Sequence, residues 1–249
     1  MKLSTSQQEQ FNADGFLVLR HFADHELCDT ILELAQVHLK HKIPPIETES
    51  EYIGEDKEAL RVTVRRLRQV YHRDIVFKTW MENEEIRPIL EQVLEDTPVL
   101  TLAHHNSIMT KMPHTSIETS WHQDVRYWNF ENDNLVSVWL ALDEEFSENG
   151  VLEFIPGSHK IQFSAEQFED KQYFSCTPPE NRRLIEKKTS TVLQKGDVVL
   201  FHGRLLHRAN KNDTDKAKIS FVYTVKGKKN KSIKGTRSSE YPEISLEQI

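Results

Sequence analysis

The sequence has little of what several protein classes require. Its 249 residues include two cysteines, Cys28 and Cys176, too few for a disulfide framework, so we expect reduced thiols and a cytoplasmic protein. No stretch approaches the roughly 18 apolar residues of a membrane span, and the first residues lack the apolar region of a secretory signal. With 39 acidic and 32 basic residues, the net charge of −7 argues against nucleic acid as the main partner. A globular protein remains.

The first part of the chain, about residues 1–97, carries mainly helical signals. Asp24 is placed to cap a helix, and residues 74–94 predict one or two more helices. The apolar stretch at residues 16–19 is short enough to be a strand. Residues 47–60 are acidic and irregular, so we expect a mobile loop there.

The middle of the chain, about residues 98–225, changes to short strands separated by turns. The predicted strands are residues 99–103, 107–111, 120–124, 136–142, 151–155, 191–193, 197–201 and 218–224. Short strands at this spacing favour a sandwich or barrel. Helices that precede a β-rich block predict an α+β fold with a jelly-roll-like core. We treat residues 1–249 as a single domain.

The last part of the chain, residues 226–249, is strongly charged. Residues 226–237 hold six lysines and arginines, and the residues after them turn acidic. Such a composition is typical of a solvated, partly disordered tail. The alternative is a flap that binds a phosphate or a carboxylate.

Histidine and aspartate side chains supply the candidate chemistry. His122 and Asp124 are two residues apart on a predicted strand, and this spacing places both side chains on one face. One histidine and one carboxylate make two thirds of the facial triad that binds non-heme Fe(II), with a second histidine as the third ligand. His202 and His207 both follow a predicted strand, and sequence spacing does not choose between them.

Several motifs, in the same order, resemble the phytanoyl-CoA dioxygenase family of Fe(II)/2-oxoglutarate oxygenases. The resemblance covers about residues 7–225. The motifs are FNADGFLV (11–18), WHQD (121–124), VWLALD (138–143), ENG (148–150), FIPGSH (154–159) and the segment 196–207 that ends in a histidine. This set is specific for the family but does not specify a substrate.

The resemblance implies a fold and a metal centre. The fold would be a double-stranded β-helix (jelly-roll, cupin-like) core with N-terminal helices packed on one sheet. His122, Asp124 and His207 would be the catalytic iron ligands, which leaves His202 in the core or near the metal. The expected cofactors are Fe(II), the co-substrate 2-oxoglutarate and O2. The expected reaction is hydroxylation of a small organic molecule at a C–H bond, with release of succinate and CO2.

The residues that would hold 2-oxoglutarate depart from the family pattern. An arginine usually follows the distal histidine, whereas this chain offers Lys216 or Lys218. A lysine gives a point charge in place of a bidentate guanidinium. Lys111 resembles a family lysine on the strand before the ligand motif, and Trp139 resembles a tryptophan beside the co-substrate.

Substrate contacts are implied for the residues just after the ligand motif, Arg126, Tyr127 and Trp128. An arginine beside two aromatic side chains suits an amphipathic or anionic substrate. The alternative is an aromatic cluster that supports the strand beside a solvated arginine. Four further histidines are candidates for lining the pocket (His104, His105, His114) or for a structural position in a turn (His159).

Two other function classes stay open on the sequence. One is a non-catalytic sensor that binds the metal and 2-oxoglutarate on the same scaffold, because fold alone does not fix function. The other is zinc-assisted hydrolysis, for which the sequence shows no general-base motif. Asp124 argues against halogenation, since its carboxylate occupies the position that a halide would need. We expect a small-molecule substrate and a monomer or weak homodimer.

Overall fold

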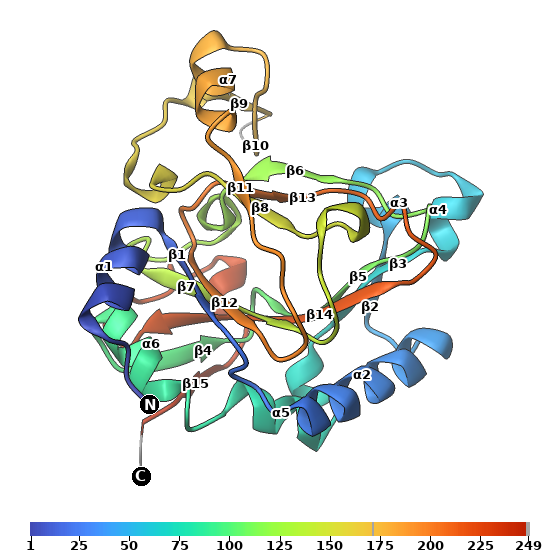
Figure 1. The fold of residues 1–249 in the computed structure, drawn as a ribbon, viewed down its shortest axis with the longest axis horizontal. Coiled ribbons are helices and arrows are strands. Elements are labelled where there is room, and N and C mark those ends of the chain that lie inside the picture. Colours follow the sequence, from blue (N-terminus) through green and yellow to red (C-terminus); the bar gives the residue numbers. More distant parts are fainter. Residues whose placement is uncertain (171, 248–249) are drawn as a thin grey trace.

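Two antiparallel β-sheets face each other in the computed structural model, which describes residues 1–170 and 172–247 (Figure 1). In the larger sheet the strand order is β1 (Phe16–Leu19), β12 (Val198–His202), β7 (Leu135–Ala141), β14 (Lys218–Gly227), β5 (Asn106–Lys111), β3 (Val64–Arg68) and β2 (Ile46–Thr48), with β4 (Pro98–Thr101) paired to β14 and β15 (Glu243–Ser245) paired to β4. The order in the smaller sheet is β11 (Thr189–Ser190), β8 (Leu152–Phe154), β13 (His207–Ala209), β6 (Thr119–His122), β10 (Tyr173–Phe174) and β9 (Phe168–Glu169).

The α-helices are α1 (Thr5–Asp14), α2 (His25–Lys40), α3 (Glu49–Ile53), α4 (Glu58–Val62), α5 (Ile75–Met81), α6 (Arg87–Leu94) and α7 (Pro179–Ile185). Helices α1, α2, α5 and α6 cover the outer face of the larger sheet, whereas α7 packs against the smaller sheet (Figure 1). The Asp24 carboxylate accepts the backbone N–H groups of Glu26 and Leu27, so α2 begins where the sequence predicts. Phe77 of α5 packs edge-on against Phe221 of β14, with ring centroids 5.7 Å apart.

Each strand of the larger sheet divides its side chains between two layers. On β7, Val138 and Leu140 belong to the core beneath the helices, whereas Trp139 belongs to the layer between the two sheets. Phe154 of the smaller sheet and Phe201 of β12 complete this inner layer. Alternation along a strand therefore gives one hydrophobic core for stability and a second layer that walls a cavity. The α+β fold with a jelly-roll core and helices on one sheet is confirmed.

The acidic segment 47–60 is not the irregular loop that its composition predicts. It contributes the end of β2, all of α3 and the start of α4. Glu47 forms an ion pair with Arg66 at 2.6 Å, and Glu49 forms one with Arg65 at 3.0 Å. Both arginines lie on β3, so the acidic residues neutralise a charged strand that the sequence pattern did not reveal.

The expectation of a solvated, partly disordered tail is wrong for residues 226–247. β14 continues to Gly227, and β15 adds a strand to the larger sheet. Lys226 is 1% exposed, donates to the carbonyl of Asn230 at 2.7 Å and pairs with Glu243 at 2.9 Å. Segments from the first, middle and last parts of the chain thus share one sheet. Across the described ranges, none of the helices has the length and apolar character needed to cross a bilayer.

Candidate metal centre and adjoining cavities

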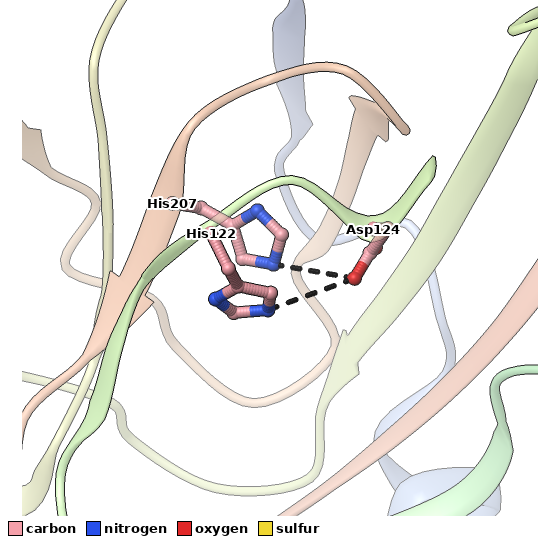
Figure 2. Close-up of side chains that lie close together, drawn as sticks. All are labelled: His122, Asp124 and His207. Atoms are coloured by element: carbon pink, nitrogen blue, oxygen red, sulfur yellow. Dashed lines mark ion pairs between the residues drawn. The ribbon is translucent and has the colours of Figure 1, made fainter. Parts of the chain in front are cut away.

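His122, Asp124 and His207 come together between the two sheets (Figure 2). His122 ends β6 and lies directly opposite His207, the first residue of β13. The strand stops at His122, and Asp124 begins a 3-10 turn, Asp124–Tyr127. The Nε2 atom of each histidine lies 3.7 Å from Asp124 Oδ1, and one donor atom from each of the three residues lies within 4.8 Å of the other two.

Backbone carbonyls fix the orientation of both imidazoles. The Nδ1 atom of His122 donates to the carbonyl of Ser120 at 2.8 Å, and that of His207 donates to the carbonyl of Leu205 at 3.0 Å. Because a carbonyl can only accept, both rings carry their proton on Nδ1 and present the Nε2 lone pair. Both free lone pairs therefore lie toward the Asp124 carboxylate, as metal ligands would.

Hydrogen bonds also hold the Asp124 carboxylate. Its Oδ2 accepts the Ser137 hydroxyl at 3.1 Å, and its Oδ1 lies 3.1 Å from His105 Nε2. Burial by itself would raise the pKa of Asp124, but the imidazoles of His105, His207 and His122 outweigh it, and the pKa lies below its ordinary value. Partners of this kind, around the ligating groups, orient them for a metal.

Burial keeps both histidines neutral. It lowers the pKa of His122 to about 3, with a further contribution from the neighbouring His207, and it lowers the pKa of His207 as well. Two neutral imidazoles and one carboxylate are the donor set that suits non-heme Fe(II) and leaves open coordination positions. The residues present therefore fit a bound Fe(II) ion.

The structure distinguishes His202 from His207 as the third candidate ligand, which sequence spacing could not do. His207 joins His122 and Asp124, whereas the His202 ring lies 5.5 Å from the ring of His159. His202 Nδ1 accepts the backbone N–H of Arg204 at 3.0 Å. Burial lowers the pKa of His202 to about 4, so it is a neutral structural group.

An inner cavity lies beside His122 and His207, and most of the predicted co-substrate residues line it. Lys111, Trp139 and Lys218 are among its wall residues. Lys216 is not, because its side chain is 77% exposed and forms an ion pair with Asp143 at the surface. Of the two lysines that the sequence could not separate, only Lys218 faces the cavity.

A buried carboxylate already neutralises Lys218. Lys218 Nζ lies 3.2 Å from Glu145 Oε2, and both side chains are almost fully buried. Glu145 also accepts the indole N–H of Trp139 at 3.0 Å and the Ser220 hydroxyl at 2.6 Å. Lys218, Trp139 and Ser220 therefore all donate to the carboxylate of Glu145. Nothing in the sequence singles out Glu145 from the two acidic residues before it.

The second cavity lysine has no carboxylate partner in the described part of the chain. Lys111 donates to the carbonyl of Ile117 and lies 3.4 Å from the hydroxyl of Thr119. Burial, followed by the charge of Arg65, lowers its pKa to about 7. Arg65 lines the same cavity, is almost fully buried and pairs with Glu49. Sequence reasoning missed Arg65, since nothing in the charged stretch Arg65–Arg68 marks one arginine as buried.

A larger outer cavity of about 380 Å³ opens on the other side of His122 and Asp124. Tyr127 and Trp128, two of the three residues expected to contact the substrate, line it. Arg126 does not, because its guanidinium lies over the Phe168 ring at 3.5 Å, and Arg126 lines a separate cavity. The histidines next to the metal strand divide similarly: His104 and His105 line the outer cavity, whereas His114 is exposed and pairs with Asp215.

Two tyrosines that the sequence did not single out also line the outer cavity. Tyr173 lies opposite His122 on β10, and its hydroxyl donates to that of Tyr52 on α3 at 2.9 Å. Arg65 stacks on the Tyr52 ring at 3.4 Å. The segment expected to be a loop thus supplies one wall of the cavity.

Comparisons with known proteins agree with this arrangement. The chain is 21% identical over 265 residues to "Phytanoyl-CoA dioxygenase domain-containing protein 1" of Bos taurus, which covers 89% of each chain. It is 26% identical over 255 residues to "Phytanoyl-CoA dioxygenase, peroxisomal" of Rattus norvegicus, covering 94% of this chain and 72% of the relative.

Solved structures share the fold. The epimerase SnoN in complex with Fe3+, alpha ketoglutarate and nogalamycin RO superimposes with a TM-score of 0.75 at 17% identity, covering 91% of this chain and 84% of SnoN. EctD from S. alaskensis with 2-oxoglutarate and 5-hydroxyectoine gives a TM-score of 0.73 at 19% identity, covering 93% and 78%. The sequence profile of the phytanoyl-CoA dioxygenase (PhyH) family matches residues 11–220. The chain therefore belongs to the phytanoyl-CoA dioxygenase family.

Proposed function

We propose that this chain is an Fe(II)- and 2-oxoglutarate-dependent oxygenase that hydroxylates a small organic molecule at a C–H bond and releases succinate and CO2. His122, Asp124 and His207 hold the iron. The observation that carries the proposal is the orientation of both Nε2 lone pairs toward one buried carboxylate, between two cavities. Family membership supports it, as do the SnoN structure in complex with alpha ketoglutarate and the EctD structure with 2-oxoglutarate.

The inner cavity is the proposed co-substrate site. Lys111 and Lys218 offer positive charge to the distal carboxylate of 2-oxoglutarate, and Trp139 forms the adjacent wall, with Lys218 Nζ 5.0 Å from its ring centroid. Bound iron and 2-oxoglutarate would together activate O2 for oxidation of the substrate. The apolar side chains of Leu152, Phe201 and other wall residues exclude water from this side of the site.

The outer cavity is the proposed substrate site. Tyr127 and Trp128 place aromatic surface beside the metal ligands, and Tyr52 and Tyr173 extend it. His105 is a positioning residue, because it contacts Asp124 Oδ1 and would hold that carboxylate in its ligating orientation. Substrate would bind within reach of the iron without contact to Arg126.

A non-catalytic sensor is the second candidate function, and one observation favours it. Because Glu145 neutralises Lys218, the inner cavity offers a distal carboxylate less net charge than a free cation would. A protein that retains iron and 2-oxoglutarate without turning them over is compatible with such a site.

The conversion of 2-oxoglutarate to succinate separates the two functions. We expect the Fe(II)-loaded protein to form succinate in an O2-dependent manner, and the variant His122→Ala to form none. His114→Ala is the matched control, since His114 is exposed and lines neither cavity. Absence of succinate from the wild type, with 2-oxoglutarate binding retained, would support the sensor, and wild-type turnover in His122→Ala would remove His122 from the metal centre.

A further inference from the structure

The outer cavity continues into a narrower one whose wall carries mainly hydrogen-bond donors. Arg66, Ala103, His104 and Arg237 line both cavities, which makes the two continuous. The narrower cavity adds Arg68, Asn106 and Ser107 among its wall residues. Within the described ranges its wall includes three arginines and no carboxylate, so it would attract a negatively charged group.

Two of these arginines lack a carboxylate partner among the residues that the structure describes. Arg66 pairs with Glu47 at 2.6 Å, but neither Arg68 nor Arg237 forms an ion pair with any residue in 1–170 or 172–247. The Nε–H group of Arg237 donates to the carbonyl of Ala103 at 3.2 Å, which leaves the terminal nitrogens of its guanidinium available. Free guanidinium nitrogens are the donors that bind carboxylates and phosphates in a bidentate manner.

The two arginines of β3 lie on the same side of the larger sheet as the proposed iron site. Arg66 and Arg68 are two residues apart on β3, opposite Met109 and Ser107 of β5. Met109 lines the inner and outer cavities beside His122. Residues at this spacing share a strand face, so the row of side chains leads from the metal centre to the donors.

The C-terminal segment holds Arg237 in place over the cavity. The hydroxyl of Ser238 is within 2.7 Å of His104 Nε2 and accepts the backbone N–H of Asn129 at 2.9 Å. Ser238 is 1% exposed, so this anchor is part of the folded core. The basic tail therefore supplies a guanidinium to the substrate side of the molecule.

We propose that Arg68 and Arg237 bind an anionic group, a carboxylate or a phosphoryl group, on the substrate whose reacting carbon lies beside the iron ligands. Such a substrate is an anionic small molecule, with an uncharged part against the aromatic wall of the outer cavity. The assignment of this anion as substrate rests on the proposed oxygenase function. Binding of an anion at these residues does not.

Matched small probes test the site on the full-length protein. Phenyl phosphate and benzoate each join a ring to an anionic group, and benzyl alcohol is the neutral counterpart. Calorimetric titrations would be made with saturating Mn²⁺ and 2-oxoglutarate under nitrogen, so that the inner cavity is filled. We expect an anionic probe to bind at least about tenfold more tightly than benzyl alcohol, and we expect this difference to shrink at high salt. The anion that binds more tightly identifies the anionic group that the site prefers.

Two variants and one control locate the binding. Arg237→Ala removes one guanidinium from an exposed turn, and Arg68→Ala removes the other from the end of β3. Each should weaken the anionic probes by about tenfold or more and leave benzyl alcohol unchanged. Arg183→Ala, on the exposed side of α7, should change neither. Equal affinity for charged and neutral probes, or wild-type affinity in both variants, would overturn the proposal.

The succinate assay keeps this result separate from the proposed function. Probe affinity that depends on Arg237, together with absence of succinate, would retain the anion site and reject the oxygenase. Succinate formation with probe affinity that is independent of Arg237 and Arg68 would retain the oxygenase and reject the anion site.

Discussion

The buried ion pair between Glu145 and Lys218 gives the sharpest prediction about stability. Glu145→Ala removes the acceptor of Trp139, Lys218 and Ser220 at once and leaves the charge of a 3% exposed lysine without a partner. Removing one partner of a buried pair costs about 3–5 kcal/mol. For a chain of this length each kcal/mol lowers Tm by roughly 2–4 °C, so we expect a decrease of about 6–20 °C.

Circular dichroism during thermal unfolding measures this decrease, and the surface pair Lys216–Asp143 provides the control. Lys216→Ala breaks an ion pair whose lysine is 77% exposed, and exposed pairs contribute about 0–1 kcal/mol. We also expect 2-oxoglutarate to raise the Tm of Glu145→Ala more than that of the wild type, because its carboxylate replaces the missing counter-charge. A Tm decrease of Glu145→Ala no larger than that of Lys216→Ala would refute this reasoning.

Three further predictions concern the cavities and the second histidine. Lys218→Met should raise the apparent KM for 2-oxoglutarate by about tenfold, whereas Lys216→Ala should leave it unchanged; equal effects in steady-state kinetics would contradict the assignment of Lys218. The pKa of Lys111 is about 7, so its positive charge is lost as the pH rises through 7. The KM for 2-oxoglutarate should therefore rise between pH 6 and 8 in the wild type and stay constant in Lys111→Arg. A wild-type KM that does not change with pH would exclude Lys111 as an anchor. The pKa of His202 is about 4 in the folded chain and has its ordinary value near 6.5 in the unfolded chain, so its contribution to stability falls as the pH decreases from 6.5 to 4. The variant His202→Asn should therefore unfold less readily in acid than the wild type. Identical acid unfolding curves would contradict this.

The candidate metal centre could be predicted from the sequence because two of its three proposed ligands are close neighbours in the chain. His122 and Asp124 are separated by one residue, so local geometry alone brings them close. The third ligand needed tertiary information. His202 and His207 follow the same strand, and only the pairing of His207 opposite His122 across β13 and β6 distinguishes them.

The residues that line the cavities were harder to predict because their burial depends on partners far away in the sequence. Lys216 and Lys218 differ by two positions, but β14 begins at Lys218, and Lys216 lies before it. Arg65 reads as a surface residue until Glu49, contributed by an acidic segment, neutralises it. Arg237 belongs to a basic stretch whose composition suggested disorder, while buried contacts such as that of Ser238 with His104 hold it in the fold.

Anaerobic binding of Fe(II) and 2-oxoglutarate tests the central claim most directly. A visible charge-transfer band forms only when the metal and the 2-oxo acid bind together, so it reports on the assembled site independently of turnover. We predict this band for the wild type and for His202→Asn, and no band for His207→Ala. A band in His207→Ala, or its absence from the wild type, would contradict a metal centre built from His122, Asp124 and His207.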